Sequence, residues 1–395
     1  MYELGLFVHE LPLDVLPGHL SDIIFVPLLT LILIIMKKIL LTLSMALFAI
    51  LFLYAQTTPV GSPQNLNWKG PESTRGAYFP DIFLQGTFIE IGASDAGSFG
   101  TTSPAPPGFH PRMGSSHLGF VADWEMNGWN ASSGPGIPFY SGDYFLPGDP
   151  WEGFLVEFTY NGNEHTARNC GANFWYGVIP THFSETSSGN TKSTLWQGTF
   201  SAAGQSLGVE QKTYFDIGEA RFFMEITLTN TGSETLYDVE YARSVDPDQE
   251  QNLTNDYTTK NWVSRPTGAV DGFAEVIAEG LVYGIPIALR LYHPDAVASV
   301  FANWPIWTPN LVLDSPNQPD KDNPVIEDWS IDVAVRFPSL APGASETFLV
   351  SYVLNWSEIE DPTPPDPRIP VSDWALYLGI LLIVTFSVIR FRRIS

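Results

Sequence analysis

The sequence predicts an all-β protein, a large antiparallel β-sandwich, from its composition and its local patterns. Of 395 residues, 13% are aromatic, 33 are Gly and 32 are Pro, a mixture of residues that pack on pleated sheets and residues that form turns. Short segments such as Gly86–Gly92 and Gly153–Tyr160 alternate apolar and polar residues, as half-buried strands do. Only 16% of the residues are charged, and helical periodicity is confined to the two apolar ends.

Two pairs of strand-like segments are each joined by a short turn sequence. Arg221–Asn230 leads through Thr-Gly-Ser to Thr235–Tyr241, and Asp332–Phe337 leads through Leu-Ala-Pro-Gly-Ala-Ser to Glu346–Leu354. Strand, turn and strand at such short spacing predict two β-hairpins. Repeated short strands of this kind are typical of a sandwich.

Charge and cysteine content exclude some classes of protein. The formal net charge is −24, so nucleic acid is not an expected partner, because its phosphates would be repelled. A single cysteine, Cys170, cannot form an intramolecular disulfide. The core must therefore be stable without a cross-link, and the expected role of Cys170 is that of a small buried thiol.

The N-terminal region predicts export. Residues 36–55 combine Lys37 and Lys38 with an apolar run and end at Ala55, so signal peptidase is expected to cut before Gln56 after handling by the export machinery. Residues 1–35 fit poorly in front of this signal, and we interpret them as a mis-assigned upstream extension. The alternative is a helical hairpin with the two lysines at its tip. Residues 56–79 then form an N-terminal extension of the mature chain.

The C-terminal region predicts a membrane or sorting tail. A Pro-rich linker over 357–368 precedes 369–395, which hold a short motif, an apolar helix and a basic end. The motif resembles the IPTL-type tail of proteins processed by exosortase-like transpeptidases, although it lacks the Thr-Leu pair and has Ala375 in place of Gly. The resemblance implies sorting from the inner membrane to the cell envelope or surface. A plain single-span anchor is the alternative. The tail residues concerned are Ile369, Pro370, Ser372, Trp374, Arg390, Arg392 and Arg393.

The body resembles galactose-mutarotase-like domains. The resemblance rests on Phe222–Asp248, Leu118–Asn130 and Gly142–Phe154, and it implies one β-supersandwich over 80–356. Enzymes of that fold use a carboxylate base and histidines. No histidine lies within or beside Arg243–Asp248, so the family's catalytic residues cannot be placed here. We therefore expect the fold without epimerase activity.

An acidic loop suggests a calcium site. Asp246, Asp248 and Glu250 alternate directly after a predicted strand, and hard oxygen ligands of this kind suit calcium. A second acidic run covers 314–323. Neither matches the twelve-residue helical calcium loop, and a solvated acidic loop is the alternative in both places.

Aromatic residues in Gly-rich loops suggest carbohydrate binding, because aromatic faces stack on sugars while carboxylates bind hydroxyl groups. Packing at the ends of the sandwich is the alternative. The sequence thus favours an exported, non-catalytic surface protein that binds polysaccharide or builds an extracellular layer, rather than an enzyme. The competing class is a carbohydrate-active enzyme, a glycoside hydrolase with a Glu125 and Glu152 pair or an epimerase. The candidate sugar-binding residues are Trp124, Trp129, Tyr144, Trp151, Glu125 and Glu152.

Overall fold

A computed structural model describes residues 78–110, 116–129, 142–147, 150–172, 175–302, 305–315 and 318–361. The predicted signal peptide with its cleavage site at Ala55 and Gln56, and the predicted sorting tail from Ile369 onward, lie outside these ranges. Within them, no helix has both the length and the apolar character that crossing a membrane requires.

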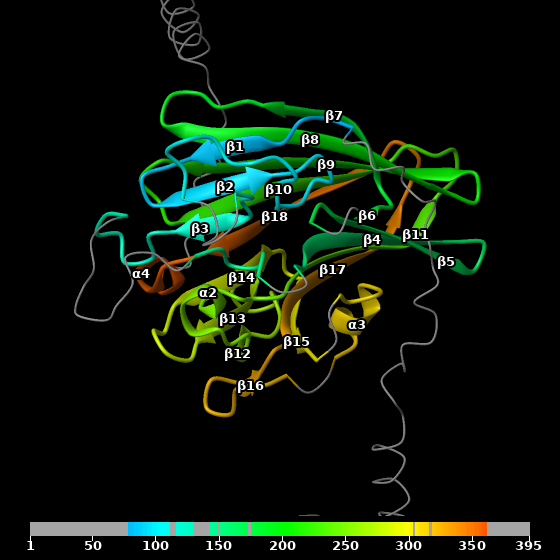
Figure 1. The fold of residues 1–395 in the computed structure, drawn as a ribbon. Helices are drawn as coiled ribbons and strands as arrows, with labels where there is room; N and C mark the ends of the chain where they lie inside the picture. The colour runs from blue at the N-terminus through cyan, green and yellow to red at the C-terminus, as the bar shows by residue number, and fades with distance from the viewer. Residues whose placement is uncertain are drawn as a thin grey trace, which may run out of the picture. The chain divides into compact units, whose positions relative to one another are not determined.

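Antiparallel strands form two large sheets and one small sheet (Figure 1). The larger sheet has nine strands, in the spatial order β16 (Val325–Glu327), β12 (Thr259–Arg265), β13 (Ala274–Gly280), β14 (Pro286–Tyr292), β18 (Ser345–Val353), β10 (Arg221–Asn230), β9 (Gln205–Asp216), β8 (Thr191–Ala202) and β7 (Ile179–Glu185).

The second sheet has six strands and the third has three. The six-stranded sheet runs β15 (Val297–Phe301), β17 (Ser330–Leu340), β11 (Leu236–Val245), β4 (Glu152–Tyr160), β5 (Asn163–Cys170) and β6 (Trp175–Tyr176). The small sheet runs β1 (Ile82–Gln85), β2 (Ile89–Ala93) and β3 (Phe120–Ala122).

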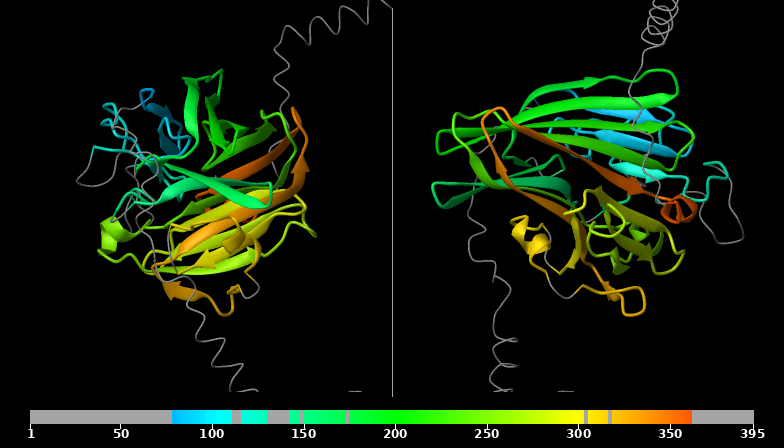
Figure 2. Two further views of the ribbon diagram at one scale, coloured as in Figure 1. Left: turned by 90° about the vertical axis from the view of Figure 1, so that its right-hand side faces the viewer. Right: turned by 180° about the vertical axis from the view of Figure 1, so that it is seen from behind.

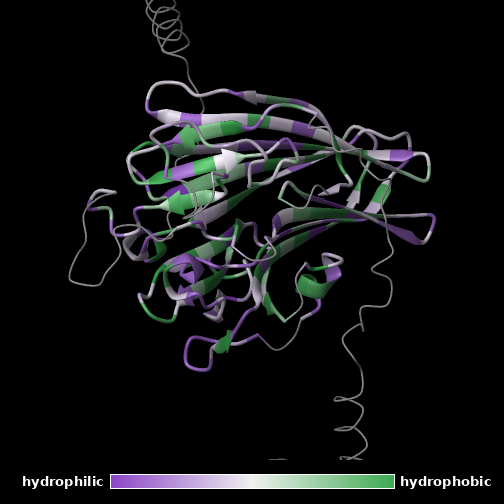
Figure 3. Ribbon diagram, in the orientation of Figure 1, coloured by the Kyte–Doolittle hydropathy of each residue, from purple (hydrophilic) through white to green (hydrophobic). Residues whose placement is uncertain are grey.

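Side chains from the inner faces of the sheets meet in one apolar core. In β9, buried residues alternate with more exposed ones along most of the strand, as the period of two in a strand requires. Figure 3 shows that the hydropathy of the residues also changes repeatedly along the strands. Tyr241 of the six-stranded sheet meets Phe348 of the nine-stranded sheet with ring centroids 5.1 Å apart. Phe120 of the small sheet lies 5.0 Å from Tyr352 in the same way, so all three sheets share the core (Figures 1 and 2).

Both predicted hairpins are wrong, although their strands are present. β10 and β11 belong to different sheets, and so do β17 and β18, so each short turn carries the chain across the core from one sheet to the other. Buried Asn230 ties the two crossings together, because its side-chain amide donates to the carbonyls of Glu234 and Leu340, both at 2.8 Å. A turn sequence marks a reversal of the chain but does not say whether the next strand pairs or crosses over.

Helices contribute little to the described residues, which confirms the all-β prediction. The three helices there have four residues each: α2 (Gln251–Thr254), α3 (Asn310–Leu313) and α4 (Trp356–Ile359). α3 covers the outer face of the six-stranded sheet, where Val312 packs in a second apolar cluster. Cys170 belongs to that cluster and is fully buried, as predicted.

Candidate functional site

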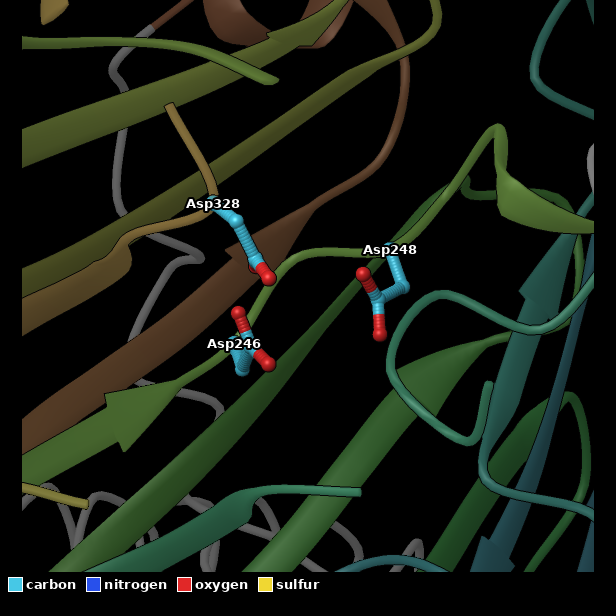
Figure 4. Close-up of side chains that lie close together, drawn as sticks. All are labelled: Asp246, Asp248 and Asp328. Atoms are coloured by element: carbon cyan, nitrogen blue, oxygen red, sulfur yellow. The ribbon is translucent and has the colours of Figure 1, made fainter. Parts of the chain in front are cut away.

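Three aspartates meet at one end of the six-stranded sheet, and we call them the acidic centre: Asp246, Asp248 and Asp328. Asp246 and Asp248 lie in the segment after β11, whereas Asp328 lies between β16 and β17. One carboxylate oxygen from each lies within 4.8 Å of the other two. Figure 4 shows the three side chains turned toward one another. β11 and β17 are antiparallel neighbours, and the end of β11 lies beside the start of β17, which brings residues some eighty positions apart in the sequence to one place.

Backbone hydrogen bonds fix the two buried aspartates. The amide of Asp246 donates to the carbonyl of Trp151 at 3.0 Å, and the amide of Asp248 donates to that of Tyr144 at 2.6 Å. Asp246 and Asp248 are 2% and 1% exposed, while Asp328 is exposed. The acidic centre is thus buried on its inner side and open on the side of Asp328.

The electrostatics of the acidic centre favour a proton or a cation on the carboxyl group of Asp328, its exposed residue. Partial burial raises the pKa of the Asp328 carboxyl above its usual value; a hydrogen bond with Asp246 opposes this shift, and the nearby charge of Asp256 adds to it. Clustered carboxylates repel one another unless a positive charge offsets them.

The spacing of the acidic centre suits calcium. Calcium lies about 2.3–2.6 Å from each oxygen ligand, so two ligands of one ion are at most about 5 Å apart. The three oxygens meet this limit, because all of them lie within 4.8 Å of one another. Magnesium binds at about 2.0–2.1 Å in a near-ideal octahedron and usually keeps several waters, whereas calcium accepts irregular sets of oxygen ligands. Asp246, Asp248 and Asp328 could therefore hold calcium.

Glu250 has a different role from the predicted one. Its carboxylate accepts hydrogen bonds from the amides of Val282 at 2.8 Å, Tyr283 at 2.9 Å and Ile285 at 3.2 Å. A β-carbon at Gly280 would lie 2.0 Å from the Glu250 carboxyl, so only glycine fits beside it. Glu250 organises the turn before β14, and Asp328, which the sequence pattern did not single out, takes its place near Asp246 and Asp248.

Aromatic residues are sequence neighbours of the aspartates on the open side of the acidic centre. Tyr257 directly follows Asp256, whose charge acts on the Asp328 carboxyl, and Trp329 directly follows Asp328 in the sequence. Tyr257 is 38% exposed, and Trp329 packs partly against the core. An exposed aromatic face beside carboxylates is a combination that binds sugars.

Three of the predicted sugar-binding residues lie in the interior. Tyr144, Trp151 and Glu152 are fully buried, so none has a surface on which a sugar could stack. The Trp151 indole donates to the hydroxyl of Ser244 at 2.8 Å, which fits the packing alternative for this residue.

Glu152 instead forms a buried ion pair with Arg243, at 2.6 Å, with neither side chain exposed. The hydroxyl of Tyr352 donates to the same carboxylate at 2.9 Å, and the amide of Phe99 donates at 2.8 Å. Desolvation raises the pKa of Glu152, and the charge of Arg243 lowers it. The predicted Glu125 and Glu152 glycosidase pair therefore has one member sealed in the core.

The other three candidates lie in and after the loop that follows β3. Trp124 packs partly against the core, and Glu125 accepts a hydrogen bond from Asn127 at 3.2 Å. Trp129 stacks on His110 with the ring centroids 4.3 Å apart, and its indole donates to the carbonyl of Thr87. The Nδ1 of His110 lies 3.0 Å from the Glu90 carboxylate.

A polar row that the sequence did not reveal crosses the outer face of the six-stranded sheet. Glu240 pairs in register with Glu157 on one side and Arg336 on the other. Arg336 donates to Glu240 at 2.6 Å, and Asn310 of α3 donates to Glu157 at 3.1 Å. Burial raises the pKa of Glu240 to about 7, and the pKa of Glu157 is raised for the same reason. Only strand register shows that the two carboxylates are neighbours.

The chain matches no family model and no curated protein. Among solved structures it is similar to a candidate aldose 1-epimerase from Escherichia coli K12, with 12% identity, a TM-score of 0.33 and coverage of 70% of this chain and 99% of that one. For a galactose mutarotase related enzyme from Lactobacillus acidophilus, the identity is 9% and the TM-score 0.31, with coverage of 69% of this chain and 97% of that one. For a polysaccharide lyase, the identity is 13% and the TM-score 0.30, with coverage of 70% of this chain and 32% of that one. At these values the likeness concerns the fold, and no activity or residue role carries over.

The comparison corrects one expectation. The sequence led us to expect a non-catalytic protein and to keep an enzyme as the alternative, yet the solved structures with a similar fold include aldose epimerases.

Proposed function

We propose that the protein is an exported carbohydrate-active enzyme of the glycoside hydrolase or epimerase class, with calcium held by the acidic centre. The observation that carries this proposal is the convergence of three carboxylate oxygens within 4.8 Å, two of them from buried aspartates and one from an exposed aspartate. The buried pair would fix the ion, and the exposed member would leave one side of it open to a ligand.

Each part of the acidic centre has a definite task in this proposal. When bound, calcium supplies a positive charge that attracts the hydroxyl oxygens of a sugar. The backbone amides of Asp246 and Asp248 donate to the carbonyls of Trp151 and Tyr144, which holds these two residues at the end of β11. Asp328 faces solvent, and the exposed Tyr257, next in sequence to Asp256, would offer an aromatic face for the sugar ring.

Export and sorting form a separate part of the proposal. The Lys37 and Lys38 signal segment supports passage through the export machinery, and the Ile369–Pro370 motif with its basic end supports processing by an exosortase-like transpeptidase. A carbohydrate-active enzyme at the cell envelope or surface would meet polysaccharide there.

An activity screen tests the proposed function. The full-length protein is incubated with neutral and acidic oligosaccharides, and reducing-end release and anomer exchange are followed with calcium or with chelator. We expect turnover of at least one substrate that falls at least tenfold with chelator and in Asp328→Asn. Asp320→Asn is the matched control, because Asp320 lies in another acidic loop and its Oδ1 accepts local backbone amides. Turnover that is indifferent to both chelator and Asp328→Asn would contradict the proposal.

A further inference from the structure

Two tryptophans enclose an arginine on the outer face of the six-stranded sheet. The guanidinium carbon of Arg168 lies 4.3 Å from the centroid of the Trp175 ring and 4.0 Å from that of Trp307. The two ring centroids are 6.5 Å apart, with the planes inclined by 31°. Both contacts are within the distance at which a cation is attracted to an aromatic face. We call Trp175, Arg168 and Trp307 the tryptophan platform.

Local sequence explains why Trp307 faces outward. Ile306, its neighbour, is fully buried in the apolar cluster that Val312 of α3 also joins. With Ile306 turned into the protein, Trp307 turns away from it and is 38% exposed. Among the tryptophans in the described ranges, it alone is more than a third exposed.

The rest of the platform is held from below. Trp175 packs edge-to-face on buried Trp151, with centroids 5.4 Å apart, and Cys170 of β5 pairs with Trp175 in β6. Burial lowers the pKa of Arg168 to about 10, which still leaves it charged at neutral pH. Trp175 is therefore packed in place before any ligand arrives, so binding would cost little ordering of this side chain.

Hydrogen-bonding groups lie next to the platform. Leu155 pairs with Arg168 across β4 and β5, and one step along the same face Glu157 pairs with Thr166. Asn310, three residues after Trp307, contacts Glu157 at 3.1 Å. An aromatic face bordered by carboxylate, amide and guanidinium groups is the combination that recognises a sugar ring and its hydroxyl groups.

We propose that the tryptophan platform binds a neutral saccharide chain, at a place separate from the acidic centre. The net charge of −24 opposes the approach of anionic chains such as polyuronates. Near the platform, the guanidinium of Arg336 donates to Glu240, and Glu157 pairs in register with the same residue, so acidic and basic groups are mixed there. A platform of this kind would hold a polymer near the acidic centre, or hold the protein on a polymer, without taking part in chemistry.

Binding of defined oligosaccharides tests this inference. The full-length protein is titrated calorimetrically with cellohexaose, mannohexaose and hexagalacturonate, in chelator so that the acidic centre does not contribute. We expect at least one neutral hexasaccharide to bind and hexagalacturonate to bind more weakly. Removing one stacking face in Trp307→Ala should weaken binding about tenfold. Arg168→Lys keeps the charge but loses the planar stack, and it should also weaken binding.

Control variants keep the test decisive. Tyr237→Ala removes another exposed aromatic side chain of the same sheet and should leave binding unchanged. The melting temperature of each variant shows whether it folds. Preferred binding of hexagalacturonate, no binding of any of the three probes, or unchanged binding by Trp307→Ala would each overturn the inference. Because Asp328→Asn should abolish turnover but not platform binding, failure of one proposal is distinguishable from failure of the other.

Discussion

The carboxylate of Glu152 lies 2.6 Å from the guanidinium of Arg243, in a core where neither side chain is exposed. Gln211 adds a hydrogen bond to the same guanidinium at 3.0 Å, and Tyr352 donates to the carboxylate. This ion pair joins β4 and β11 of one sheet to β9 and β18 of the other. Because a single buried charge is far more costly than a buried pair, each partner depends on the other.

Breaking the pair should destabilise the protein strongly. Glu152→Gln keeps the side-chain shape but leaves Arg243 uncompensated, and we expect a loss of about 3–5 kcal/mol in the free energy of unfolding, measured by denaturant titration. Replacing both residues, in Glu152→Gln with Arg243→Met, should cost less than the sum of the single changes. Lys260→Met is the control, since its partly exposed pair with Glu279 should contribute at most about 1 kcal/mol. A loss below that of the control would contradict the account.

The Glu240 carboxyl should make stability depend on pH. Burial raises its folded-state pKa from 4.5 to about 7, so folding favours its protonated form. Its contribution is then complete at acidic pH below the unfolded-state pKa and is lost as pH rises toward and through about 7. Asp332 is shifted in the same direction, from 3.8 to about 7. The melting temperature should therefore fall between pH 5 and pH 8.

Glu240→Gln should flatten part of this decline, because glutamine does not titrate, and the part due to Asp332 should remain. Arg336 and Glu157 face Glu240 from the neighbouring strands, and both stay in place in this variant. A melting temperature that rises over this interval, or an unchanged slope in Glu240→Gln, would count against the assignment.

Processing of the tail can be followed in cells with a C-terminal tag. If the transpeptidase proposal holds, the tag separates from the body over time, and replacing Arg390, Arg392 and Arg393 by Gln slows this separation. A tail that stays joined to the body throughout would mark a plain anchor and would rule out sorting by cleavage.

Strand positions were predictable from sequence, whereas strand partners were not. Arg221–Asn230 alternates clearly enough to be predicted with the bounds that β10 has. Nothing local distinguishes its following turn from a hairpin, because the crossing to the other sheet is fixed by distant contacts such as that of Asn230 with Leu340.

Only the residues of the candidate site that lie close together in the sequence were predictable. Asp246 and Asp248 lie two residues apart after a strand, a pattern that the sequence displays. Asp328 joins them through the pairing of β11 with β17, and Glu157 meets Glu240 through register alone. Whether a tryptophan packs in the core or offers a face to a sugar depends on its burial, and burial likewise depends on the whole fold. Trp151 is fully buried, whereas Trp307 is 38% exposed.

Calcium-dependent stability tests the central claim most directly. Thermal unfolding of the full-length protein is measured in calcium, in chelator, and in sodium chloride of matched ionic strength, for the unchanged chain, Asp248→Asn and Asp320→Asn. A ligand that binds only the folded state at a hundredfold excess over its Kd stabilises by about 2.7 kcal/mol. We predict that calcium raises the melting temperature of the unchanged chain and of Asp320→Asn but not of Asp248→Asn, and that sodium chloride does not reproduce the rise. An equal response in all three proteins, or none in any, would contradict a calcium site at the acidic centre.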